Sequence, residues 1–163
     1  MKNNQEAAYM GQEFLLWLYW KSCEDGTFSL ENLGLGEINI SVEEVIDLVS
    51  IKGDGYSETI KSTEIMELDS VRESIRLGRL PSLAKIRIIS NHLEWFFQLK
   101  ASPFKMSSVK LPLTGEKDEA EMISQRLDSL TKLDLIMKAL FNTFMLEREE
   151  EGFVKNIKIF LGM

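Results

Sequence analysis

Few residues in this sequence have side chains that enzymes use as nucleophiles or bases. His92 is the only histidine and Cys23 the only cysteine. Residues 91–92 separate two apolar runs and predict a hairpin turn with an exposed imidazole, whereas Cys23 follows an apolar helix with Lys21 as its only nearby cation. A thiol and an imidazole need only meet in space to react together, but the spacing gives no support for such a pair. We therefore expect a non-enzymatic protein that uses no cofactor.

Two other patterns resemble ligand sites only in part. Residues 33–37 contain two glycines but lack the third glycine and the following helix that hold a phosphate, which predicts a loop between strands. The carboxylates Glu43, Glu44 and Asp47 lack a histidine or an Asp-rich loop, which favours a solvated face over a metal site. A single cysteine also excludes an internal disulfide framework.

The distribution of charge is more informative. The 163 residues carry 19 Lys and Arg against 26 Asp and Glu, a net charge of −7. Between Arg79 and Lys110, however, six residues are basic and only Glu94 is acidic. Such a segment can attract a polyanion to an acidic protein, because the local field acts at the binding site. The candidate nucleic-acid contacts are five of these cations and one aromatic residue: Lys85, Arg87, Phe96, Lys100, Lys105 and Lys110.

The strand pattern of this segment places these residues on one surface. Residues 83–101 predict a β-hairpin, and a third strand is expected over 104–111. The apolar side chains of the hairpin then pair on one face: Ile88 with Trp95, Ile86 with Phe97 and Ala84 with Leu99. The opposite face carries the cations around Phe96. Lysine and arginine on such a face also discourage edge-to-edge pairing of sheets, so a merely solvated face is the alternative interpretation.

Two helices are expected to pack against this sheet. The first, over about residues 4–22, is apolar on every side across Phe14–Trp20 and must be enclosed. The longest, over about 118–149, carries a wide apolar stripe, and Leu135 and Ile136 lie off that stripe. Because this helix has more apolar surface than one sheet needs, we expect a homodimer that forms through it. The predicted fold is a single α+β domain over residues 1–163.

Shorter elements complete this prediction. Residues 38–41 and 45–51 predict two strands, and a turn at 52–55 leads to a returning strand over 56–62. A short helix follows, with an apolar stripe through Val71, Ile75 and Leu77. No apolar run approaches the roughly 18 residues that span a bilayer, so we expect a cytoplasmic protein without membrane contact.

The aromatic helix also carries a family resemblance. Its residues 11–20, GQEFLLWLYW, resemble the G-x-E-F-L-x-W-L signature of the bacterial recombination-associated RdgC and RdgC-like proteins. The later features follow in a similar order: RLGRLP at 76–81, the hairpin over 84–101, VKLP at 109–112 and a long helix near 127–148. The resemblance covers about Gly11 to the C-terminus and corresponds to the C-terminal half of full-length members.

The resemblance implies sequence-independent binding of double-stranded DNA in recombination. Full-length members form ring-shaped homodimers whose basic inner surface encircles the duplex, so lysines and arginines would neutralise phosphates without reading bases. The positions similar to the family's basic hairpin and following strand are Lys100, Lys105 and Lys110, with Lys85 and Arg87 nearby. The family's N-terminal half has no counterpart here, so we expect dimerisation to be kept and encirclement to be lost. The alternative function is a homodimeric protein-interaction module without DNA contact.

Overall fold

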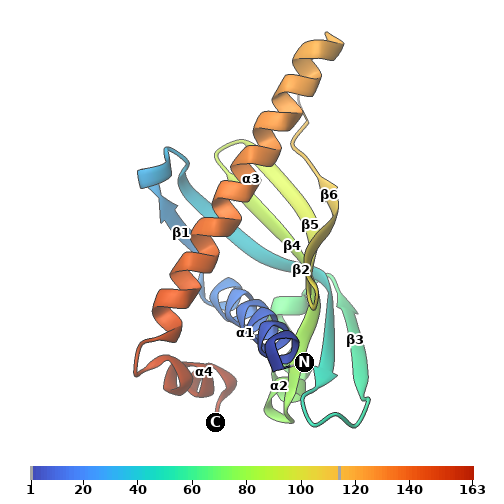
Figure 1. The fold of residues 1–163 in the computed structure, drawn as a ribbon, viewed down its shortest axis with the longest axis vertical. Coiled ribbons are helices and arrows are strands. Elements are labelled where there is room, and N and C mark those ends of the chain that lie inside the picture. The colour runs from blue at the N-terminus through green and yellow to red at the C-terminus, as the bar shows by residue number, and fades with distance from the viewer. Residues whose placement is uncertain (1, 114) are drawn as a thin grey trace.

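A computed structural model describes residues 2–113 and 115–163, with side chains described from Tyr9 onward (Figure 1). Within these residues, four α-helices and six strands follow one another: α1 (Lys2–Glu24), β1 (Thr27–Leu30), β2 (Gly36–Ser50), β3 (Ser57–Ser62), α2 (Asp69–Arg76), β4 (Arg79–Ser90), β5 (Leu93–Ala101), β6 (Phe104–Lys110), α3 (Glu119–Arg148) and α4 (Phe153–Leu161). The strands form one antiparallel sheet in the order β1-β2-β4-β5-β6, and β3 also pairs with β2. The fold is therefore α+β, with the aromatic helix and the long C-terminal helix packed against the sheet as predicted.

Helix α1 is the centre of the core. Every side chain from Phe14 to Trp20 is buried. One side of α1 packs on a face of the sheet, and α3 and α4 cover the side of α1 that faces away from the sheet (Figure 1). The rings of Phe14 and Trp17 lie 5.4 and 5.8 Å from the ring of Phe144 on α3. This arrangement explains how a helix that is apolar on every side is kept away from solvent.

The β4–β5 hairpin has the predicted register. Ile88 pairs with Trp95 and Ile86 with Phe97, and these four side chains are buried on the face that α1 covers. Asn91 and the exposed His92 form the turn, in which Asn91 takes a positive φ of 53°. Asparagine tolerates this conformation better than most residues, which is one reason why the chain reverses here.

The two strands predicted within residues 38–51 are one strand, and that part of the prediction is wrong. Strand β2 runs without interruption from Gly36 to Ser50, but its register against β4 shifts between Val42 and Ile46. Glu44 lies in this irregularity with a positive φ of 57°. The two glutamates at 43–44 interrupt the apolar alternation of the sequence and so predict a boundary between two strands. In the sheet they lie in a bulge of one continuous strand.

Helix α3 has the predicted length, and the Asp118 carboxylate caps it by accepting a hydrogen bond from the Glu121 N–H. Its C-terminal half is buried against α1 and the sheet. Ile136, expected off the apolar stripe, is 0% exposed, while Leu135 is 39% exposed. Ile136 therefore belongs to the core, because the helix turns a broader apolar face inward than the seven-residue repeat indicates. Of the described helices, none is long and apolar enough to cross a membrane.

The N-terminal half of α3 extends beyond the sheet, next to the chain that follows β6 (Figure 1). Three residues of the predicted stripe are consequently exposed here: Ile123 (50%), Leu127 (60%) and Leu130 (42%). A helix of 30 residues is about 45 Å long, which is more than the sheet beside it covers. The stripe therefore packs on the fold along only part of its length.

Candidate nucleic-acid interface

All six residues predicted to contact nucleic acid lie on the face of the sheet opposite α1. Two come from each of three neighbouring strands: Lys85 and Arg87 from β4, Phe96 and Lys100 from β5, and Lys105 and Lys110 from β6. The side chains alternate along β5, so that the neighbours at 95, 97 and 99 are buried on the other face. In register, Phe96 lies between Arg87 and Lys110, and Lys100 lies opposite Lys105. The sheet therefore gathers the six side chains on one surface.

Two of these cations are already paired with carboxylates of this chain. Lys85 forms an ion pair with Glu44, and Arg87 forms one with Glu94 and a longer one, 3.8 Å, with Glu43. The hydrogen bond from the Lys85 ammonium lowers the pKa of Glu44. The β2 bulge places Glu43 and Glu44 beside β4. The charge of segment 79–110 alone therefore overstates how basic this face is.

Phe96 contributes to holding these two cations in place. The Lys85 ammonium lies 5.9 Å and the Arg87 guanidinium 5.6 Å from the centre of its ring. At these distances the negative face of the ring attracts both charges. Phe96 thus has a structural role on this face, in addition to the nucleic-acid contact predicted for it.

The remaining three cations are Lys100, Lys105 and Lys110, which we call the lysine surface. All three are exposed, and within the described part of the chain none of them forms an ion pair. Lys100 and Lys105 are direct cross-strand partners, a placement that is unfavourable for like charges. The lysine surface is therefore where an external anion gains most from binding.

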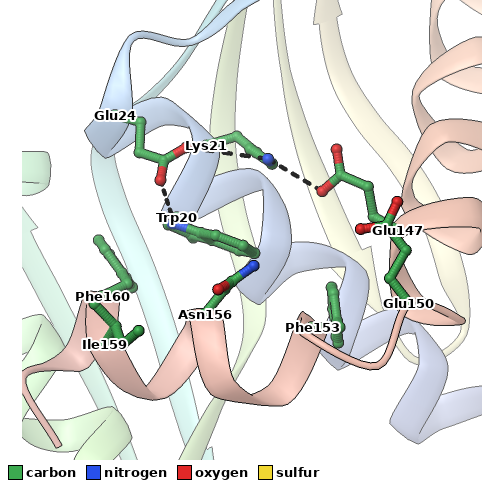
Figure 2. Close-up of a pocket in the computed structure, with 9 residues that line it drawn as sticks. All are labelled: Trp20, Lys21, Glu24, Glu147, Glu150, Phe153, Asn156, Ile159 and Phe160. Atoms are coloured by element: carbon green, nitrogen blue, oxygen red, sulfur yellow. Dashed lines mark hydrogen bonds and ion pairs between the residues drawn. The ribbon is translucent and has the colours of Figure 1, made fainter.

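A cleft of about 440 Å³ lies elsewhere, between the C-terminal ends of α1 and α3 and the helix α4 (Figure 2). Lys21 extends between Glu24 and Glu147, with its Nζ 3.0 Å from the Glu147 carboxylate, and the Trp20 Nε1 donates a hydrogen bond to Glu24. The Trp17 Nε1 also donates to Glu147, at 2.8 Å. These two carboxylates thus already have donors from this chain, and the contacts join α1 to α3.

The residues considered for catalysis are not in contact with each other. His92 is exposed in the β4–β5 turn, whereas the Cys23 thiol is half-buried and donates to the Met66 carbonyl oxygen at 3.4 Å. Burial raises the pKa of this thiol. No group of three or more His, Cys, Asp or Glu side chains in the described residues is arranged to hold a metal ion.

No protein-family model matches this chain, and no curated protein matches it at a significant level. The likeness to RdgC-like proteins therefore rests on the sequence features quoted above. The structure gives the first of them, residues 11–20, a role in folding: the segment forms the buried part of α1. Gly11 lies where this helix approaches the backbone of Ala101 at the end of β5, too closely for a larger residue.

Proposed function

We propose that this protein binds double-stranded DNA without sequence preference and without catalysing a reaction, as its resemblance to recombination-associated RdgC-like proteins implies. The observation that carries the proposal is the lysine surface: three exposed ammonium groups that form no ion pair within the described residues, on the face of the sheet opposite α1. Ammonium groups bind phosphates as point charges, and contacts to phosphates carry no sequence information. Binding of this kind releases counterions and weakens steeply with added salt.

The two paired cations are expected to contribute little to DNA binding. Lys85 and Arg87 lie beside the lysine surface, but their carboxylate partners compete with DNA phosphates for them. We therefore expect three phosphate contacts, which corresponds to a slope of about −2.7 for the logarithm of the binding constant against the logarithm of salt concentration. Between 50 and 200 mM salt, such a slope weakens binding by about 40-fold.

Fluorescence anisotropy with labelled duplexes of equal length and unrelated sequence tests this proposal. The wild-type protein should bind the duplexes with similar affinity and show the expected salt dependence. A variant with Lys100, Lys105 and Lys110 changed to Gln should bind DNA much more weakly. Any binding that remains should depend little on salt concentration. The matched control changes three other lysines to Gln and so has the same net charge: Lys138, Lys155 and Lys158.

The control variant should bind DNA within about twofold of the wild type, because its substitutions lie on α3 and α4 and away from this face. Equal binding by the two triple variants would show that the lysine surface is not the site. Binding by the wild type that does not change with salt would contradict a phosphate-based mechanism altogether.

A second candidate function, self-association, is favoured by the exposed half of α3. Ile123, Leu127 and Leu130 follow one another at helical spacing and form one apolar face that extends beyond the sheet. Contiguous apolar surface of this kind is typical of interaction sites. We propose that a second copy of this chain covers it, which would make the protein a homodimer.

Sedimentation velocity across the micromolar range measures this association. The wild type should sediment increasingly as a dimer, and Leu127→Glu should remain monomeric at every concentration. Val154→Glu is the matched control, because Val154 is exposed to a similar extent, 62%, on α4. A monomeric wild type, or an equal loss of dimer in both variants, would rule out this interface.

A further inference from the structure

The strongest unassigned feature outside these surfaces is a group of polar atoms around Cys23, at the C-terminal end of α1. Tyr19 and Cys23 are one helical turn apart and lie on the same side of the helix. Tyr19 is fully buried, whereas the Cys23 side chain is half-buried and therefore remains accessible to small solutes. The Cys23 thiol has the Met66 carbonyl oxygen as its acceptor.

A third group, Arg72 of α2, lies near Tyr19 and Cys23, because Tyr19 and Arg72 both contact the ring of Phe160 on α4. The Tyr19 ring lies 5.9 Å from the Phe160 ring, edge to face, and the Arg72 guanidinium carbon lies 5.0 Å from the centre of that ring. Both Tyr19 and Arg72 lie close enough to the Cys23 sulfur to influence its pKa. Three elements of the fold thus place a phenol and a guanidinium beside one thiol.

Two donors in this group have no nitrogen or oxygen acceptor. Among the described residues, the Tyr19 hydroxyl and the Arg72 Nε are the buried side-chain oxygen and nitrogen atoms without such a partner. Both side chains interact with the Cys23 sulfur, which is only a weak acceptor. An oxygen atom attached to that sulfur would supply a stronger acceptor for both, and buried donors are more stable with one.

We propose that Cys23 is a site of reversible oxidation by hydrogen peroxide, and that the Tyr19 hydroxyl and the Arg72 Nε hold the oxygen that its sulfur gains. The Cys23 thiolate attacks one peroxide oxygen, the sulfur–oxygen bond forms and the oxygen–oxygen bond breaks. Hydroxide leaves and takes up a proton to become water, so the sulfur loses two electrons and the peroxide gains them. The product is a sulfenate, which a thiol can reduce again.

The surroundings of Cys23 make the sulfenate slow to form but long-lived once it has formed. Burial disfavours the thiolate, so oxidation is slower than at an exposed, activated cysteine. The same burial limits access of a second peroxide molecule to the sulfenate. Because Cys23 is the only cysteine of the chain, no second thiol of the same molecule can convert the sulfenate into a disulfide.

Peptide mapping after peroxide treatment tests the proposal directly. Cleavage after lysine and arginine releases residues 22–52, a peptide that contains Cys23 but no methionine or tryptophan. Any oxygen that this peptide gains therefore reports on Cys23 alone. We expect a product that dimedone traps and that dithiothreitol reverses. Absence of this product at peroxide concentrations that oxidise free glutathione would overturn the proposal.

The role of the Tyr19 hydroxyl is tested by Tyr19→Phe, with Tyr56→Phe, an exposed tyrosine, as the matched control. Tyr19→Phe should shorten the lifetime of the sulfenate several-fold, with conversion to the sulfinic acid, while the control leaves it unchanged. The thermal midpoint of the reduced Tyr19→Phe protein should equal or exceed that of the wild type, because the lost hydroxyl has only a weak sulfur acceptor. An unchanged sulfenate lifetime in a folded Tyr19→Phe variant would show that the hydroxyl does not hold the oxygen.

Discussion

Substitution of Gly11 by alanine measures how closely α1 approaches the sheet. A Cβ atom at Gly11 would lie 3.1 Å from the carbonyl carbon of Ala101 and closer still to its oxygen, whereas ordinary van der Waals contacts begin at 3.4 Å. The obstacle is backbone at the end of β5, so no side chain can rotate away. Overpacking of this kind destabilises proteins by about 1–3 kcal/mol.

The sign of the effect is diagnostic, because Gly11 lies inside a helix. In open space, alanine would stabilise the helix by about 0.5–1 kcal/mol relative to glycine. We therefore expect Gly11→Ala to lower the free energy of unfolding, measured in urea, by about 1–3 kcal/mol and to lower the thermal midpoint by roughly 2–4 °C per kcal/mol.

Gly152→Ala is the matched control for this measurement. Gly152 is the N-cap of α4 and has an ordinary φ of −80°, and a Cβ there would meet only the Asn156 amide, at 3.6 Å. This change should alter the free energy of unfolding by less than about 1 kcal/mol, because two effects oppose each other. Alanine lowers the entropy of the unfolded chain, which stabilises the fold, but it is a poorer N-cap than glycine, which destabilises the helix. A Gly11→Ala protein as stable as the wild type would refute the close packing of α1 on β5.

Three further outcomes follow from the packing and the charges. Ile136→Ala should lower the free energy of unfolding by about 2–5 kcal/mol, whereas Leu135→Ala, one residue away, should lower it by less than about 1 kcal/mol, both measured in urea. Burial raises the pKa of Tyr19 above its ordinary value of 10.0, so the unfolded chain releases this proton first as pH rises. Stability should consequently fall above pH 10, less steeply in Tyr19→Phe, as urea midpoints across that range would show. Replacing Glu43, Glu44 and Glu94 together by Gln should free Lys85 and Arg87 and steepen the salt dependence of DNA binding to a slope of about −4.5 in anisotropy titrations.

Much of the fold follows from local patterns. The run Phe14–Trp20 is apolar on every side and predicted a buried helix, and the alternation over residues 83–101 predicted the register of the β4–β5 hairpin. Both predictions are confirmed because a continuous apolar run and a period of two leave few alternatives for burial. The boundaries of α3 were also predicted to within one residue, since a long apolar stripe at helical spacing leaves few alternatives.

The candidate interface was predictable only in part. Alternation placed its six residues on one face, since side-chain direction along a strand is a local property. The pairing of Lys85 was not predictable, because Glu44 is distant in sequence and lies in a bulge where the sequence pattern predicts a strand boundary. Arg87 pairs with Glu94 of the same hairpin, which the charge count included, and through a longer contact with Glu43. A charge count along the chain omits partners that lie across the sheet.

Local sequence patterns were enough to predict the fold class, the buried aromatic helix and the single face that carries the candidate cations. They did not predict which of those cations form ion pairs, which half of α3 is exposed, or that Arg72 lies with Tyr19 beside Cys23. The period of burial is a property of one helix or strand, whereas ion pairs, uncovered surfaces and buried polar groups depend on which elements become neighbours in the fold.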